Sequence, residues 1–541
     1  MPTSRLTMRR RGSWLALTAL AGLAFTSVAA AGVPASNAAT GGGSPAGWTM
    51  FGQNVNNTAS AGSMQVGTNN VKLLKPKWAF TTGGDVSARA AVANGVAYFP
   101  DWSGHLYAIK SSSGKLVWSK NILTDYLPNV FSPAPTKVVS RTSPFLDTAT
   151  NTLYIGTQKG AYMLAINAST GALKWATQLD SHPLAIDSTS PVVFGGVVYV
   201  GVASLEEAAA VDPSYPCCTF RGSVVALNAT TGAISWKTLT VPTGYNGGAV
   251  WGSTIVPDPT RGVVYATTGN NYFTPTDPAY QTCIANGGTP ETCNSPDDHF
   301  DSVVALNMTT GAYVWTDRFG SSDDWTVACF FNGVNCPVNA GPDFDFGSGV
   351  QLFTIQTSSG PQTIIGAGQK SGVYSAIDPS TGLVLWATQV GPGSSLGGME
   401  WGSATDGKRI YVQIANFYGI PNQMTDGSTT TGGSWAALDP ATGRIIWQVA
   451  DPNGDVDLGP MTVANGVVYA ASMAGAPTDK TMFALNAATG ATLWSFAAGS
   501  SVNAGASIAN DTVYWGSGYT NLGIPGWTGN NKFYAFSLGG N

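Results

Sequence analysis

Charged residues are scarce in this sequence. Asp, Glu, Lys and Arg make up 10% of the 541 residues, and the formal net charge is −5. Basic residues gather only near the N-terminus, which argues against nucleic acid as a partner. Histidine is scarcer still, with three residues in all, so a His-rich metal site is excluded. The sequence Cys-x-x-Cys-His does not occur, which excludes covalently attached c-type haem.

Long apolar runs are missing beyond the N-terminus. Arginines at 9–11 precede an apolar stretch over residues 14–28, and small residues follow. This order is typical of a secretory signal; the alternative is a membrane anchor, for which the stretch is short. We therefore expect residues 1–39 to be a signal peptide and residues 40–47 a flexible leader. The mature chain would then be secreted or periplasmic, with no membrane span.

Cysteine is limited to six residues that lie close to one another in pairs. Six cysteines fit an oxidising compartment. The simplest pairing, by proximity, gives three disulfides, and other connectivities stay open. The three pairs are Cys217–Cys218, Cys283–Cys293 and Cys329–Cys336.

Glycine and a tryptophan repeat are abundant. The pattern small–aliphatic–Asn/Asp–x–x–Thr–Gly–x–x–x–Trp recurs seven times, each copy after a stretch that alternates like a strand. Asn or Asp starts a tight turn, Gly supplies a positive φ, and Trp packs beyond the turn. The copies end at Trp118, Trp175, Trp236, Trp315, Trp386, Trp447 and Trp494.

An eighth copy is divided between the two ends of the chain. Residues 533–537 carry its first half and residues 73–78 its second half. Joining them would close a ring and remove the exposed sheet edges. We therefore predict an all-β fold, a single eight-bladed β-propeller over residues 48–541 whose ring is closed by N- and C-terminal strands. The repeats are unevenly spaced, which indicates loop insertions that often build a site.

The repeat and its eightfold count resemble the quinoprotein alcohol dehydrogenases, which use pyrroloquinoline quinone (PQQ), and within them the polyvinyl alcohol dehydrogenase-like proteins. The resemblance implies oxidation of an alcohol, secondary or polymeric, with PQQ and Ca²⁺. It also implies an external electron acceptor such as a cytochrome c, because the chain has no haem motif. Outer-membrane assembly factors share the propeller without a cofactor, so the loop residues decide.

Several loop residues match the cofactor site of that family. Arg141 stands where the family has an arginine for the carboxylates of PQQ, and a guanidinium suits them. Ser188 matches a hydroxyl that contacts the cofactor, and Trp251 matches the tryptophan beneath the PQQ ring. The adjacent Cys217 and Cys218 resemble the family's vicinal disulfide over PQQ, although they lie in a different loop. The resemblance thus implies a lid element.

Further matches concern the metal and the chemistry. Glu206 and Asn270 match the protein ligands of Ca²⁺, although the two residues before Glu206 depart from the family pattern. Asp345 matches the general base and a further metal ligand, and Lys370, 25 residues later, matches a basic residue beside the quinone oxygens. Gly347 stands where lanthanide-using relatives carry Asp, which favours calcium.

Each match also has a plain structural interpretation. Asp345 could cap a turn, Glu206 could lie in a solvated loop, and Lys370 could be a surface charge. Glu400 is a second departure, since the family often has Asn there. The competing hypotheses are a non-catalytic scaffold or assembly factor and a carbohydrate-binding propeller. The enzyme hypothesis predicts that five residues converge on the central channel: Glu206, Trp251, Asn270, Asp345 and Lys370.

Overall fold

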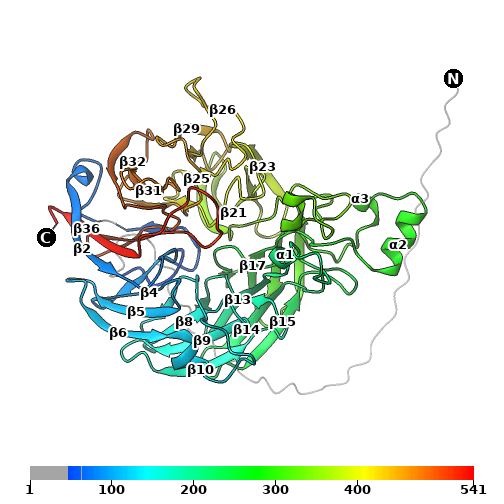
Figure 1. Ribbon diagram of the computed structural model, residues 1–541. Helices are drawn as coiled ribbons and strands as arrows, with labels where there is room; N and C mark the ends of the chain where they lie inside the picture. Colours follow the sequence, from blue (N-terminus) through cyan, green and yellow to red (C-terminus); the bar gives the residue numbers. More distant parts are fainter. Residues whose placement is uncertain (1–46, 63, 541) are drawn as a thin grey trace, which may run out of the picture. The chain divides into compact units, whose positions relative to one another are not determined.

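The tryptophan repeats form the two outer strands of four-stranded antiparallel sheets. The computed structural model describes residues 47–62 and 64–540, so the predicted signal peptide lies outside the described residues. Eight such sheets follow one another around a ring (Figure 1). The predicted eight-bladed propeller is therefore confirmed.

The blades are numbered in chain order, each from its innermost strand outward. Blade 1 contains β3 (Ala91–Ala93), β4 (Val96–Pro100), β5 (His105–Lys110) and β6 (Leu116–Asn121). Blade 2 contains β7 (Phe145–Asp147), β8 (Thr152–Gly156), β9 (Tyr162–Asn167) and β10 (Leu173–Gln178). Blade 3 contains β12 (Val192–Phe194), β13 (Val197–Ser204), β14 (Ser223–Asn228) and β15 (Ile234–Leu239), and β11 (Ala185–Ile186) also pairs with β13. Blade 4 contains β16 (Val256–Asp258), β17 (Val263–Thr267), β18 (Ser302–Asn307) and β19 (Tyr313–Arg318).

The second half of the ring repeats this arrangement. Blade 5 contains β20 (Gln351–Thr357), β21 (Gly360–Gly368), β22 (Val373–Ile377) and β23 (Val384–Gln389). Blade 6 contains β24 (Ala404–Thr405), β25 (Ile410–Ile414), β28 (Ser434–Leu438) and β29 (Ile445–Ala450), and its loop carries the hairpin β26 (Asn422–Gln423) and β27 (Thr429–Thr430). Blade 7 contains β30 (Thr462–Ala464), β31 (Val467–Ala471), β32 (Met482–Asn486) and β33 (Thr492–Phe496), with β1 (Ser60–Ala61) parallel to β30.

Blade 8 is built from both ends of the chain. It contains β34 (Ser507–Ala509), β35 (Thr512–Ser517), β36 (Lys532–Leu538) and, as its outermost strand, β2 (Leu74–Thr81). Strand β2 is antiparallel to β36, with Leu74 opposite Leu538, and the blue and red strands lie side by side in Figure 1. The divided repeat therefore closes the ring as predicted.

The Thr-Gly and Trp of the repeat fit together across neighbouring blades. The indole of Trp175 in blade 2 covers Gly232 in blade 3, where a Cβ would lie 2.6 Å from the ring. Trp175 Nε1 also donates a hydrogen bond to Ala229 O, at 3.1 Å. Gly232 has a φ of +74°, so the turn and the covering indole both require glycine there. The sequence repeat is thus a blade-to-blade docking unit.

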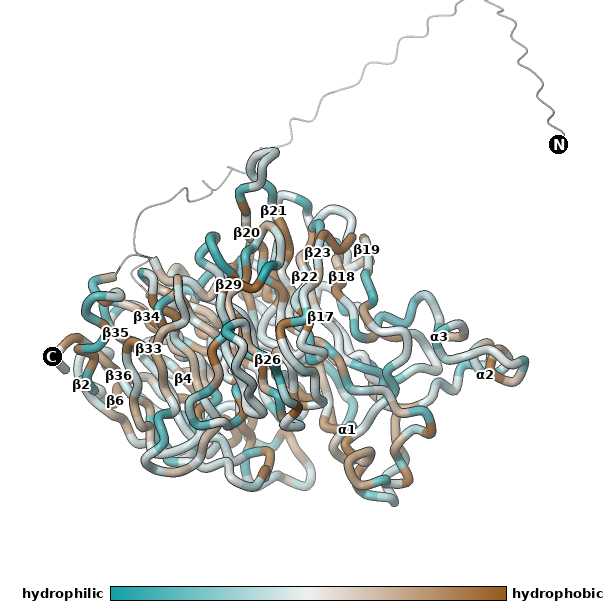
Figure 2. The backbone as a smooth tube through the Cα atoms, turned by 90° about the horizontal axis from the view of Figure 1, so that it is seen from above, coloured by the Kyte–Doolittle hydropathy of each residue, from teal (hydrophilic) through white to brown (hydrophobic). Residues whose placement is uncertain are grey.

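Three loop insertions carry the disulfides and most of the helices. Short helix α1 (Glu206–Ala209) and Cys217–Cys218 follow β13, and the 3₁₀ turn η3 (Val327–Phe331) with Cys329–Cys336 follows β19. Helices α2 (Pro278–Ala285) and α3 (Pro290–Cys293), joined by Cys283–Cys293, project from one side of the ring in Figure 2. The three predicted disulfides are confirmed. The remaining helical turns are η1 (Val71–Leu73) and the π-helical η2 (Ile122–Tyr126).

The segment that precedes β1 crosses from blade to blade along the innermost strands. Trp48 pairs with Val92 of blade 1, and Leu146 N of blade 2 donates to Thr49 O. Further along, Asn56 O accepts a hydrogen bond from Leu352 N of blade 5, and Thr58 O accepts one from Thr405 N of blade 6. We call residues 47–59 the axial strap, because they join blades on opposite sides of the ring.

No helix within residues 47–62 and 64–540 is long and apolar enough to span a membrane.

Candidate active site

Loops at the inner ends of the blades enclose a cavity of about 200 Å³. Its residues come from blades 2 to 6 and 8, and from the insertions after β13 and β19. Of the nine site residues predicted from sequence, six line this cavity. They are Arg141, Ser188, Trp251, Asn270, Asp345 and Lys370.

Trp251, Asp345 and Lys370 form a connected group at the cavity wall. Trp251 Nε1 donates to Asp345 Oδ2 at 2.6 Å, and Lys370 Nζ lies 2.6 Å from Asp345 Oδ1. Lys370 Nζ is also 3.0 Å from Asp343 Oδ1 and 5.1 Å from the centroid of the Trp251 ring. A Cβ on Gly347 would lie 2.9 Å from that ring, so the close approach of the backbone requires glycine. The indole is thereby fixed in one orientation.

The cavity has more carboxylates than cations. Burial lowers the pKa of Lys370, but Asp343 and Asp345 together with other acids raise it well above its ordinary value, so the ammonium persists. Burial is also the main reason why the pKa of Glu207 rises to about 8 and that of Glu400 to about 7. The Lys370 ammonium lowers both pKa values, whereas neighbouring carboxylates, Asp345 among them, raise them. A bound cation would relieve this accumulation of negative charge.

Asn270 and Glu207 each have an oxygen atom in the cavity wall without a hydrogen-bond partner in the described part of the chain. Asn270 Nδ2 donates to Asn271 O at 2.8 Å and to Trp325 O at 2.9 Å, which fixes the amide and leaves its carbonyl oxygen available. Glu207 Oε1 is buried without a hydrogen bond. Carboxylate and amide oxygens are ligands for a hard cation such as Ca²⁺. No group of three His, Cys, Asp or Glu among the described residues could hold a metal by itself, so a cation here would need further oxygen ligands such as the Asn270 amide.

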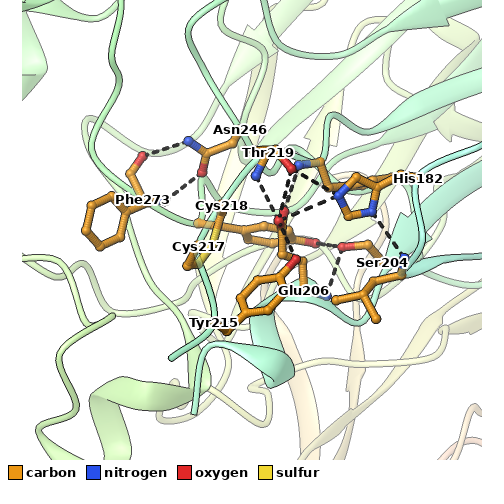
Figure 3. A network of polar contacts seen from close by, with 12 residues as sticks. His182, Ser204, Glu206, Tyr215, Cys217, Cys218, Thr219, Asn246 and Phe273 are labelled. Carbon is orange, nitrogen blue, oxygen red and sulfur yellow. Dashed lines mark hydrogen bonds and ion pairs between the residues drawn. A yellow bond between two sulfur atoms is a disulfide. The ribbon is translucent and has the colours of Figure 1, made fainter. Parts of the chain in front are cut away.

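Glu206 does not line the cavity, whereas the adjacent Glu207 does. The Glu206 carboxylate accepts hydrogen bonds from Tyr215 Oη at 2.9 Å, Thr219 N at 2.8 Å and Phe220 N at 2.7 Å, while His182 Nε2 lies 3.6 Å away (Figure 3). Both residues begin helix α1, where successive side chains point about 100° apart. Glu206 therefore faces the disulfide loop and Glu207 faces the cavity.

Cys217 and Cys218 form a disulfide that is not part of the cavity wall. Figure 3 shows it beside Glu206, on the loop whose next two residues donate to that carboxylate. Cys218 packs against a buried cluster that includes Phe220 and Tyr272, of which Tyr272 lines the cavity. The disulfide therefore lies behind the cavity wall, and its predicted role as a lid over the cofactor stays a prediction.

Sequence reasoning missed several residues of the cavity. Trp401 meets Trp251 edge to face at 5.1 Å, and the Arg141 guanidinium lies 3.8 Å from the Trp401 ring centroid. Arg141 has no ion pair among the described residues, so it is available to an anionic ligand. Glu207 and Trp401 each adjoin a residue that the sequence had singled out, whereas Tyr272 carried no signal. These missed residues are brought together by the ring.

The chain is similar to known proteins over most of its length. Residues 70–278 and 369–528 match the family described as outer membrane protein assembly factor BamB. Polyvinylalcohol dehydrogenase of a Pseudomonas species is 29% identical over 91% of this chain and 77% of the relative. Polyvinylalcohol dehydrogenase of a Sphingopyxis species is 30% identical over 82% of this chain and 68% of the relative. The structure of quinohemoprotein alcohol dehydrogenase from Comamonas testosteroni matches with a TM-score of 0.70 and 19% identity over 92% of this chain and 81% of that one, which shows the same fold.

Proposed function

Because this chain belongs to the quinoprotein alcohol dehydrogenase family, we propose that it oxidises an alcohol to a carbonyl compound with PQQ as cofactor and Ca²⁺ as metal. The observation that carries the proposal is the group Trp251–Asp345–Lys370 in the wall of the axial cavity. A scaffold or a carbohydrate-binding propeller gives no reason to bury an acid, an ammonium and an indole together beside unpartnered oxygens.

The residues present fit a flat, polyanionic quinone. The Trp251 ring, fixed by Asp345 and Gly347, offers a stacking surface. Arg141 suits a carboxylate, and the Ser188 hydroxyl, which donates to Trp251 O at 3.2 Å, can still accept. For Ca²⁺, the fitting ligands are Glu207 and Asn270, with Asp345 beside them. This set replaces Glu206 with Glu207 in the set predicted from sequence.

The chain's own groups would perform the proton chemistry. When bound, PQQ accepts the two electrons of the alcohol. Asp345 would take the hydroxyl proton of the alcohol on a carboxylate oxygen as general base. Lys370 stays protonated, so it orients Asp345 and stabilises negative charge that develops nearby. Both side chains are buried, at 3% and 5% exposure, which strengthens these interactions because water is largely excluded.

The cavity mouth favours a substrate with apolar carbon. Four apolar side chains line the cavity, those of Leu205, Val327, Phe330 and Leu522. Figure 2 shows hydrophobic residues in the loops next to α1. A secondary alcohol, free or within a polymer such as polyvinyl alcohol, combines an apolar chain with the hydroxyl group that Asp345 would deprotonate. Electrons would leave to a separate acceptor such as a cytochrome c, outside the cytoplasm.

Activity should require both PQQ and Ca²⁺. We expect the purified protein to reduce an artificial electron-accepting dye in the presence of a secondary alcohol after reconstitution with both. Omission of PQQ, or chelation of Ca²⁺, should abolish the dye reduction, and renewed Ca²⁺ should restore it. Full activity of chelated protein, or none with any primary, secondary or polymeric alcohol, would contradict the proposal.

Removal of the Trp251 ring should weaken cofactor binding. Trp251→Ala is expected to raise the dissociation constant of PQQ about tenfold, because stacking contributes about 0.5–1.5 kcal/mol beyond area burial. Equilibrium titration measures the change. Trp494→Ala serves as the control, because it removes a docking indole in blade 7, away from the cavity. It should leave the dissociation constant of PQQ unaltered in the folded protein. Equal effects of the two substitutions would refute the role of Trp251.

A further inference from the structure

A second, smaller chamber lies next to the candidate active site on the propeller axis. Its free space is about 30 Å³, and its residues come from seven blades and from Phe51 of the axial strap. It shares Arg141, Ser188 and Trp401 with the active-site cavity. No Asp or Glu lines it.

Arg89 brings a buried positive charge to this chamber. The side chain is 1% exposed, and its guanidinium donates to Phe51 O at 3.0 Å, to Met461 O and to Thr462 Oγ1 at 3.0 Å, all of which are neutral acceptors. No carboxylate within the described ranges forms an ion pair with it, and its Nε has no hydrogen-bond partner. Burial accordingly lowers the pKa of Arg89 to about 9. A buried charge without a counter-ion is unfavourable.

Three serines have hydroxyl protons for which residues 47–62 and 64–540 provide no acceptor. Ser87 Oγ accepts from Trp102 Nε1 at 2.9 Å, and Ser143 Oγ accepts from Arg89 N at 2.9 Å. Ser190 Oγ accepts from Ser143 N at 3.0 Å. Because these oxygens already accept N–H groups, each hydroxyl proton is left to donate elsewhere, and all three serines line the chamber.

The chamber therefore combines surplus donors, two arginines and no acid. Asn503 Oδ1 is the one buried side-chain acceptor among its lining residues that lacks a partner. We propose that this axial chamber binds a small monovalent anion, chloride in ordinary buffers, between Arg89, Arg141 and the hydroxyls of Ser87, Ser143 and Ser190. The free space is about twice what one water needs, which suits a halide ion.

The bound anion would tie the axial strap to the ring. Arg89 holds Phe51 of the strap through a hydrogen bond and lies 4.7 Å from the centroid of its ring. Neutralising the guanidinium in place would stabilise this contact and hence the attachment of the axial strap to the ring. The proposal does not depend on the enzymatic function, because Arg89, Ser87, Ser143 and Ser190 lie outside the active-site cavity and only Arg141 of the proposed ligands is shared with it.

Bromide locates the ion directly. Crystals of the full chain, with and without PQQ, are grown in bromide and measured at the bromine absorption edge. We expect an anomalous peak between Arg89 and the three serines in both crystals. Its absence would overturn the proposal, and so would a peak that PQQ displaces, because the cofactor's own carboxylate would then be the anion.

A carboxylate built into the chamber should replace the ion. Wild-type protein is expected to unfold roughly 2 °C higher in sodium chloride than in sodium gluconate of equal ionic strength. Asn503→Asp should unfold at the higher temperature in both salts and lose the bromide peak. Asn307→Asp is the matched control, since it adds the same charge in an exposed blade turn where Asp439 stands in blade 6, and it should keep the chloride effect. Equal unfolding temperatures of the wild type in the two salts would overturn the proposal.

Discussion

Glu207→Gln is expected to raise the Ca²⁺ concentration needed for half-maximal PQQ binding by about 100-fold or more. The substitution removes the carboxylate whose buried Oε1 has no hydrogen-bond partner among the described residues. Substitution of residues that merely support a metal ligand already lowers metal affinity about 10–100-fold, so loss of a ligand itself should cost at least as much. The measurement is a Ca²⁺ titration at fixed PQQ, followed by tryptophan fluorescence.

The adjacent residue provides the matched control. Glu206→Gln should leave the Ca²⁺ requirement unaltered but lower the unfolding temperature, because its carboxylate accepts from two backbone N–H groups and from Tyr215. Hydrogen bonds to a charged group contribute about 1.5–3 kcal/mol each. If Glu206→Gln instead abolished the response to Ca²⁺ while Glu207→Gln did not, the assignment drawn from the structure would be reversed.

Asp345→Asn should lower kcat about 10³-fold while PQQ still binds. An amide keeps an oxygen for Trp251 Nε1 but cannot take a proton from the alcohol, and general bases contribute about 10²–10⁴-fold. Steady-state rates at saturating PQQ and Ca²⁺ give kcat, and a parallel titration gives the affinity for PQQ.

A surface aspartate controls for the charge change. Asp378 sits in the exposed turn of blade 5, where other blades carry Asn, so Asp378→Asn should retain full kcat. A kcat of Asp345→Asn within threefold of wild type would remove Asp345 from the role of base. Loss of PQQ binding together with kcat would instead make Asp345 a ligand alone.

The propeller could be predicted from sequence because its determinants are local and repeated. Each turn needs Asn or Asp, Gly and Trp at fixed spacing, and the structure shows why, since the indole of one blade covers the glycine of the next. Two half-copies of the repeat at the ends of the chain predicted that the last blade is divided. In the structure, β2 pairs with β36 and completes this blade.

The site was predictable where a residue matched a local motif of the family. Trp251, Asp345 and Lys370 were found through that resemblance, the last two by their spacing of 25 residues, and all three line the cavity. Glu206 and Glu207 belong to a short helix, where one residue of register turns the side chain by about 100°, and the sequence does not give that register. Cys217–Cys218 was correctly paired, but which side of the wall it occupies depends on how the insertion folds.

Titration of the mature protein with PQQ in excess Ca²⁺, read by tryptophan quenching, shows whether the cavity binds the cofactor. The ring centroids of Trp251 and Trp401 lie 5.1 Å apart in the cavity wall, so we expect saturable quenching at one PQQ per chain, weakened in Trp251→Ala and in Glu207→Gln. No saturable quenching by a folded protein with its three disulfides intact would contradict this expectation and leave a propeller without a cofactor.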